Sequence, residues 1–174
     1  MKSLDPTGLK RLHREWRRQT NGRVGLVLDG VQSPFNVGAI VRTAAAYRVD
    51  RLWLTGATAP IASSGVRKTA LGTDRYLTIT TAERTVDAID EARGEGFHVV
   101  GVELADGAQP LHELKLGDAV CLVVGNEDHG ISAAALSACD ELAFIPQLGK
   151  VGSLNVATAT SIALYEVRRQ EWSR

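Results

Sequence analysis

No stretch of this sequence approaches the roughly 20 consecutive apolar residues that a membrane-spanning helix needs. The basic amino-terminal region is not followed by an apolar block, so we expect neither a secretory signal nor a membrane anchor. The chain holds only two cysteines, Cys121 and Cys139, and they do not form a CxxC pair. So few thiols favour a reducing compartment, and we therefore expect a cytoplasmic protein.

The sequence also lacks the common motifs of nucleotide and hydrolase chemistry. No G-x-G-x-x-G follows an expected strand, and neither G-x-x-x-x-G-K-[ST] nor G-x-S-x-G occurs. The four histidines show no metal-ligand spacing with cysteine or aspartate, so we expect no metal site. These absences disfavour phosphoryl transfer, hydride transfer, Ser-dependent hydrolysis and zinc chemistry.

Neither sign of charge is in excess, because 20 Lys and Arg balance 20 Asp and Glu. The distribution is nonetheless uneven. Residues 1–80 carry 13 basic and 5 acidic residues, whereas residues 81–174 carry 7 basic and 15 acidic residues. Such a chain can present a cationic face to a polyanion while staying neutral overall. The alternative is that folding interleaves the two halves and removes the asymmetry.

The length of 174 residues and a hydrophobic content of 44% predict a single domain, residues 1–174, with a full core. Strands rich in Val, Ile and Leu alternate with helices, which predicts an α/β fold with a mostly parallel sheet and helices on both faces. We expect strands at 24–29, 51–56, 75–80, 97–104, 119–125 and 141–146. We expect helices at 37–48, about 63–71, about 81–94, about 132–139 and 154–171.

The opening segment TGLKRLHREWRRQT predicts a basic amphipathic helix, capped by Thr7, within a short extension over residues 1–22. Leu9, Leu12 and Trp16 share one stripe, and cations cover the rest of the surface. This density of cations favours contact with RNA phosphates, and the alternative is an ordinary surface helix docked through its stripe. The candidate RNA contacts, here and near residue 67, are Arg11, Arg14, Arg17, Arg18, Arg67 and Lys68.

Three loops rich in Gly, Asn and Ser each follow an expected strand, and each leads into an expected helix. They read GVQSPFNVGAIVRTA over 30–44, LVVGNEDHGIS over 122–132 and FIPQLGKVGSLNVATATSIAL over 144–164. The carboxyl ends of parallel strands meet at one edge of a sheet. Small polar loops at that edge predict a ligand site.

In order along the chain, these loops resemble the three motifs of the SpoU-type, TrmH-like RNA 2′-O-ribose methyltransferases of the SPOUT superfamily. The resemblance extends from about Gly25 to Glu166. It implies a deep C-terminal trefoil knot, S-adenosylmethionine as methyl donor with S-adenosylhomocysteine as product, and a homodimer with the site at the subunit interface. The strand and helix pattern alone would give an unknotted doubly wound sheet, because true knots are very rare.

The resemblance also implies roles for individual residues. Arg42 is the central catalytic residue, and we expect it to stabilise a developing oxyanion because a guanidinium stays protonated. Asn36 is expected to cap the helix at Val37 and to hold Arg42 or the ribose. The full catalytic set is Asn36, Arg42, Glu127, Ser153 and Asn155. The expected donor-binding set is Val124, Gly125, Ile145, Gly149 and Leu154.

The sequence shows no added amino-terminal RNA-binding domain of the kind that ribosomal RNA enzymes of this family often carry. We therefore expect a tRNA substrate, methylated at a D-loop guanosine or an anticodon-loop nucleotide. Three alternatives stay open. The chain could act on ribosomal RNA, bind RNA without catalysis, or be an unknotted nucleotide- or flavin-binding domain.

Overall fold

Seven strands form one sheet in the computed structural model, which describes residues 3–174. The strands are β1 (Arg23–Asp29), β2 (Arg51–Thr55), β3 (Thr78–Ala82), β4 (His98–Val102), β5 (Gln109–Pro110), β6 (Ala119–Val124) and β7 (Glu141–Phe144). They lie in the order β3-β2-β1-β6-β4-β7-β5, and every strand pairing within residues 3–174 is parallel. This confirms the predicted α/β fold with a parallel sheet.

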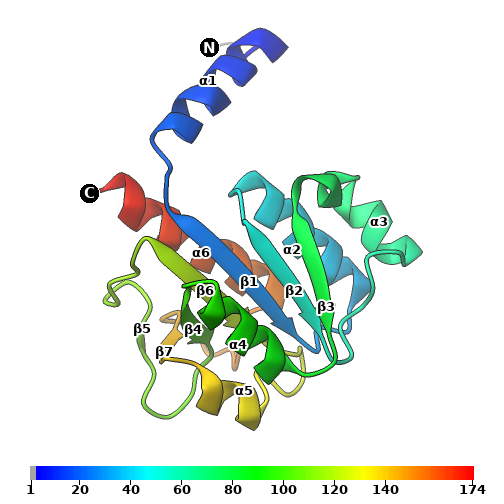
Figure 1. Ribbon diagram of the computed structural model, residues 1–174, viewed down its shortest axis with the longest axis vertical. Helices are drawn as coiled ribbons and strands as arrows, with labels where there is room; N and C mark the ends of the chain where they lie inside the picture. The colour runs from blue at the N-terminus through cyan, green and yellow to red at the C-terminus, as the bar shows by residue number, and fades with distance from the viewer. Residues whose placement is uncertain (1–2) are drawn as a thin grey trace.

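Helices cover both faces of the sheet (Figure 1). One face carries α2 (Pro34–Ala46), α3 (Ser64–Ala70) and α6 (Val156–Trp172), and the other carries α4 (Thr85–Gly94) and α5 (Ala133–Ala138). Successive side chains of a strand point to opposite faces, so the strands supply two cores. In β1, Leu26 and Leu28 join the core under α2 and α6, whereas Val27 joins the core under α4.

Several expected element boundaries were wrong. The helix expected at Val37 begins at Pro34, and Ser33 caps it by accepting a hydrogen bond from the Asn36 backbone N–H. Proline is well tolerated at the first helical position, where its missing N–H is not needed. Asn36 is therefore not the cap, and its side chain is free for other contacts. The first helix, α1 (Pro6–Arg18), is likewise capped by Asp5 rather than Thr7.

Further differences concern where elements begin and end between α3 and β7. Residues Thr73–Tyr76 form a 3-10 helix, so β3 starts at Thr78 and not at residue 75. The helix expected from about residue 81 starts at Thr85, because β3 continues to Ala82. The strands expected to reach residues 104 and 146 end at Val102 and Phe144. The short strand β5 was not expected.

Helix α1 projects away from the sheet and its covering helices (Figure 1). None of its residues is buried, and Leu9 and Leu12 are 44% and 38% exposed. Trp16 packs on Trp172 of α6, with 4.9 Å between ring centroids. Helix α1 thus contacts α6 through an aromatic pair, while Leu9 and Leu12 of its apolar stripe face solvent.

A buried arginine fixes α6 against its neighbours. Arg168 is 2% exposed and donates hydrogen bonds to the backbone oxygens of Tyr47, Arg48 and Gly22 at 2.8–2.9 Å. It also pairs with Glu171 at 2.8 Å. A buried charge is tolerated only when it is paired and hydrogen-bonded. This cluster holds α6 to the end of α2 and to the segment that enters β1.

After β7, residues 145–155 lead back to α6, which contacts α2 and β6. This return places the start of α6 beside the loops that follow β4 and β6.

The trefoil knot and the single-domain organisation stay predictions. Within residues 3–174, no helix combines the length and apolar character needed to cross a bilayer.

Candidate functional site

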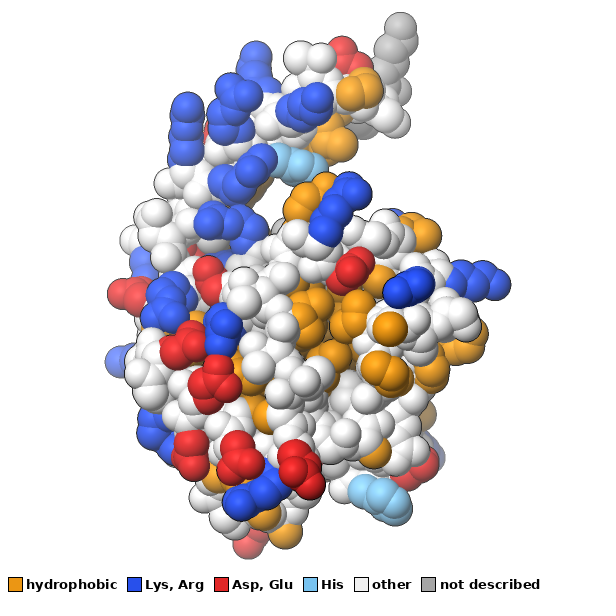
Figure 2. All heavy atoms as spheres, turned by 45° about the vertical axis from the view of Figure 1, so that its right-hand side comes forward, with side chains coloured by type: hydrophobic (Ala, Val, Ile, Leu, Met, Phe, Trp, Pro, Cys, Tyr) orange, Lys and Arg blue, Asp and Glu red, His pale blue; other side chains and the backbone are white. Residues whose placement is uncertain are grey.

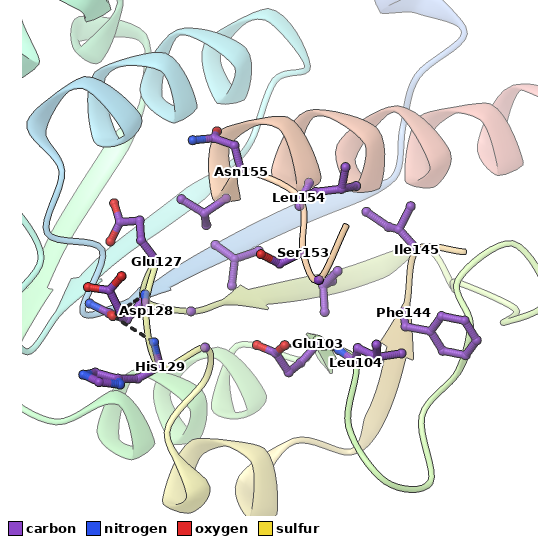
Figure 3. Close-up of a pocket in the computed structure, with 18 of the residues that line it drawn as sticks. Glu103, Leu104, Glu127, Asp128, His129, Phe144, Ile145, Ser153, Leu154 and Asn155 are labelled. Carbon is purple, nitrogen blue, oxygen red and sulfur yellow. Dashed lines mark hydrogen bonds between the residues drawn. The ribbon is translucent and has the colours of Figure 1, made fainter. Parts of the chain in front are cut away.

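A cavity of about 450 Å³ opens at the carboxyl ends of β4, β6 and β7 (Figure 3). Its walls come from residues 102–104, 124–130, 144–145 and 152–156, together with Gln147 and Ala159. Ligands of parallel sheets bind at this edge, and small-molecule sites commonly measure about 300–1,000 Å³. The cavity therefore lies at the sheet edge where a site was expected, and its walls include residues of the second and third loops but none of the first.

The carboxylate of Glu127 joins the loop after β6 to the loop after β1. Its Oε1 accepts hydrogen bonds from the Asn36 side-chain amide at 2.8 Å and from the Ser33 backbone N–H at 3.0 Å. Its Oε2 accepts from the Gln32 backbone N–H at 3.1 Å. One carboxylate thus holds the start of α2 in place.

Asn36 extends this connection to the loop before α6. Because its amide nitrogen donates to Glu127, its Oδ1 must face the other way, where it accepts from the Asn155 side-chain amide at 3.0 Å. The Asn155 Oδ1 in turn accepts from the backbone N–H groups of Ala157 and Thr158, which caps α6. We call Glu127, Asn36 and Asn155 the loop-joining network.

The hydrogen bonds also set the charge of Glu127. Partial burial alone would raise its pKa, but the bonds from Asn36 and from backbone N–H groups, including those of Ser33 and Gln32, outweigh burial. The pKa of Glu127 therefore lies below its ordinary value, since these donors stabilise the charged form. A carboxylate that is ionised and already holds three donors is a poor proton acceptor. Its geometry suits positioning the loops.

Two carboxylates that the sequence reading missed hold the loop after β6. Asp29, at the end of β1, accepts from the Ser132 backbone N–H at 2.8 Å and from the Thr85 hydroxyl at 2.5 Å. Glu103, directly after β4, accepts from the Ile131 backbone N–H at 3.1 Å. The available signal was an acidic residue at the end of the strand expected at 24–29, and another one residue before the end of the strand expected at 97–104.

The predicted catalytic residues lie in two groups. Glu127, Ser153 and Asn155 line the cavity, and Asn36 bonds to two of them. Arg42 is exposed, does not line the cavity, and makes no side-chain hydrogen bond or ion pair within residues 3–174. Asn36 and Arg42 are six residues apart in α2, which places them about 9 Å apart along the helix axis. Asn36 and Glu127 therefore bond to each other and not to Arg42.

Four of the five predicted donor-binding residues line the cavity: Val124, Gly125, Ile145 and Leu154. Gly149 lies outside its lining. Gly125 belongs to the expected donor-binding set, and the loop itself supplies a further reason for glycine at this position. A Cβ at Gly125 would lie 2.1 Å from the Gly130 carbonyl carbon and 2.2 Å from the Ile131 nitrogen. Glycine is therefore needed for this loop to close on itself.

The candidate RNA contacts lie on two helices. Arg67 and Lys68 are exposed on α3. Figure 2 shows basic side chains gathered along α1, which carries Arg11, Arg14, Arg17 and Arg18. Across residues 3–174, none of these four forms an ion pair with a carboxylate of the chain, so folding leaves their charge available to a polyanion. In the same described part, no three His, Cys, Asp or Glu side chains are grouped to hold a metal ion.

Comparison with known proteins gives the family. The model of the SpoU rRNA Methylase family matches residues 23–165, which include all three loops and the loop-joining network. The chain belongs to the SpoU methylase family. Its relatives include proteins named TrmH family tRNA/rRNA methyltransferases, and its structural neighbours are SpoU and TrmH methyltransferases.

Individual SpoU relatives differ in length from this chain. The Bacillus subtilis 23S rRNA (guanosine(2553)-2′-O)-methyltransferase RlmP is 34% identical, over 90% of this chain and 62% of that protein. The AdoMet-bound rRNA methyltransferase from Sinorhizobium meliloti matches with a TM-score of 0.80 at 35% identity, over 86% of this chain and 57% of that chain. The A. aeolicus TrmH/SpoU tRNA modifying enzyme matches with a TM-score of 0.76 at 28% identity, over 95% of this chain and 88% of that chain. The chain spans 58% to 62% of the length of the curated SpoU relatives that we compared.

Replacing Gly125 should disrupt the second loop. We expect Gly125→Ala to lower the free energy of unfolding by about 1–3 kcal/mol, because a Cβ there overlaps backbone atoms that cannot rotate away. Gly149→Ala is the matched control, since the nearest atom to its Cβ is Val151 Cγ2 at 3.9 Å. Urea denaturation of both variants measures the effect. Equal stabilities for the two would contradict the loop-closure argument.

Proposed function

We propose that this chain transfers a methyl group from S-adenosylmethionine to a ribose 2′-hydroxyl of RNA, and that tRNA is its substrate. One observation carries the proposal. Residues from three segments that are far apart in sequence bond to one another in the loop-joining network, and two of them, Glu127 and Asn155, line one cavity. Membership of the SpoU family and the AdoMet-bound Sinorhizobium meliloti neighbour support this reading.

The cavity fits an amphipathic donor of this kind. Val124, Ile145 and Leu154 supply apolar surface for the donor, while carboxylate and amide groups supply partners for its hydroxyl and amino groups. Its volume of about 450 Å³ also suits a nucleoside with a short side chain. When bound, the donor supplies an electrophilic methyl group on a sulfonium sulfur. The proposal involves no metal ion.

The residues of the chain have two tasks in this reaction. They must place the ribose in line with the methyl group, and they must stabilise the oxygen as its proton leaves. Asn155 and Ser153 line the cavity at the start of α6, where the helix dipole is positive and favours negative charge. Glu127 keeps Asn36 and Asn155 oriented, which leaves Ser153 and the start of α6 facing the cavity.

Arg42 contributes a permanent positive charge. It lies outside the cavity formed within one chain, and its side chain is exposed on α2. In the homodimer that the SpoU resemblance implies, the site lies at the subunit interface, and an exposed Arg42 is available to a cavity there. We propose that Arg42 stabilises the developing oxyanion or holds an adjacent phosphate.

The choice between tRNA and ribosomal RNA rests on the relatives. Similarity to the A. aeolicus tRNA modifying enzyme over 95% of this chain favours tRNA. Ribosomal RNA is the second candidate, and RlmP of Bacillus subtilis favours it. In either case, the exposed cations of α1 would contact phosphates, which position RNA without reading its sequence. A cytoplasmic location is part of the same proposal.

Methyl transfer from isotope-labelled S-adenosylmethionine to total RNA from cells lacking this gene tests the proposal. The RNA is fractionated by size, digested to nucleosides and analysed by mass spectrometry. We expect label in one 2′-O-methyl nucleoside of the tRNA fraction. Label only in ribosomal RNA would overturn the substrate, and label on a base would overturn the ribose chemistry. No label, with donor binding intact, would indicate an RNA-binding protein without catalysis.

Removing the Arg42 guanidinium separates catalysis from donor binding. We expect Arg42→Ala to lower kcat by about 10²- to 10³-fold, because one charge that stabilises the transition state is lost. Donor affinity should stay within about twofold, since Arg42 does not line the cavity. Arg84→Ala, which removes another exposed cation, is the control. Equal losses of turnover and donor affinity would remove Arg42 from the catalytic role.

The basic helix makes a separate prediction about salt. Replacing Arg14, Arg17 and Arg18 together by Gln should weaken RNA binding and reduce the slope of log affinity against log salt by up to about 2–3, since each phosphate contact contributes about 0.7–0.9. Filter binding with transfer RNA at several salt concentrations measures this slope. An unchanged slope would show that α1 does not contact phosphates.

A further inference from the structure

One carboxylate in the cavity has no role in the proposed reaction. Glu103 follows β4 directly, and its backbone N–H continues the sheet by donating to the Ala143 oxygen at 2.8 Å. Its backbone is therefore fixed to the sheet. In Figure 3 its side chain lies between the loop that carries Glu127 and the apolar side chains of Leu104 and Phe144.

The orientation of the Glu103 carboxylate is set by two backbone N–H groups. Its Oε2 accepts from Ile131 at 3.1 Å, and its Oε1 accepts from Leu104 at 3.2 Å. Gly130 makes room for it, because a Cβ at that position would lie 2.4 Å from Oε2. Each oxygen of a carboxylate can accept about two hydrogen bonds, so each keeps acceptor capacity. The carboxylate is thus held with two oxygens able to accept from a ligand.

The other carboxylates that line the cavity differ from Glu103. Glu127 already accepts three N–H donors, two from the loop after β1 and one from Asn36 of α2, and it belongs to the loop-joining network. Asp128, the next residue of the same loop, lines the cavity but is exposed. Glu103 is therefore the cavity carboxylate best suited to two neighbouring hydroxyl donors. Carboxylates at the ends of parallel strands recognise ribose hydroxyls in the same way in dinucleotide-binding folds.

We propose that Glu103 binds the 2′- and 3′-hydroxyl groups of the donor's own ribose through its two carboxylate oxygens. This inference rests on the proposed use of S-adenosylmethionine. It assigns the donor's ribose to the middle of the cavity, with its adenine toward Leu104, Phe144 and Ile145 and its sulfur toward the loop-joining network. Glu103 is then a specificity residue that distinguishes a ribonucleoside donor from deoxy analogues.

Binding of S-adenosylhomocysteine and of its 2′-deoxy and 3′-deoxy analogues, measured by isothermal titration calorimetry, tests the proposal. We expect the wild type to bind each deoxy analogue about 10- to 100-fold more weakly than S-adenosylhomocysteine, because a charged acceptor in the cavity loses a hydrogen-bond donor. Glu103→Ala should lose a similar factor toward S-adenosylhomocysteine. It should then bind all three compounds with nearly equal affinity.

Two further variants separate recognition from loop stability. Glu103→Gln keeps an oxygen that can accept from Ile131, so it preserves the loop and still should lose most of the discrimination. Glu113→Gln alters an exposed carboxylate outside the cavity and should bind like the wild type. Wild-type affinity or undiminished discrimination in the folded Glu103 variants would overturn the assignment while leaving the proposed function intact. Failure of the wild type to bind S-adenosylhomocysteine would overturn both.

Discussion

Glu127 accepts hydrogen bonds from Gln32, Ser33 and Asn36, which are 91 to 95 residues away in the sequence, and the site depends on this contact. Because Asn36 must donate to the carboxylate, its carbonyl oxygen turns to Asn155 and so meets the start of α6. A hydrogen bond to an ionised partner contributes about 1.5–3 kcal/mol, with exposed bonds at the lower end. Several such bonds add to the apolar contacts of Val31 and Ile131 in holding these loops.

The parallel sheet provides the frame for this network. Strands β1, β4 and β6 are neighbours or near neighbours in the sheet, so their carboxyl ends deliver Asp29, Glu103 and the loop of Glu127 to one edge. Asp29 and Glu103 bind successive backbone N–H groups after β6, and the Arg168 cluster fixes the helix that completes the cavity. The carboxylates at this edge thus position loops, while apolar packing on both faces of the sheet forms the core.

Much of the fold was predictable because buried strands read as continuous apolar runs, as in β1 and β6. The starts of helices were harder to predict. Ser33 caps α2 and Pro34 begins it, before the apolar periodicity of the helix appears. The loops were predicted from their composition and from the resemblance, but the contacts between them were not. That Asn36 would bind Glu127 and Asn155, and not Arg42, depends on which strands lie side by side. The reason for glycine at position 125 likewise appears only once the loop closes.

Hydrogen exchange in Glu127→Ala, compared with the wild type and with Asp128→Ala, tests most directly whether Glu127 holds the three loops together. Loss of the carboxylate should speed exchange at Gln32 and Ser33, which bond to it. It should also speed exchange at Ala157 and Thr158, which depend on it through Asn36 and Asn155. Amides within β1 and β6 should keep their protection, and Asp128→Ala should match the wild type. Faster exchange confined to Gln32 and Ser33, or none at all, would contradict a network that spans the three loops.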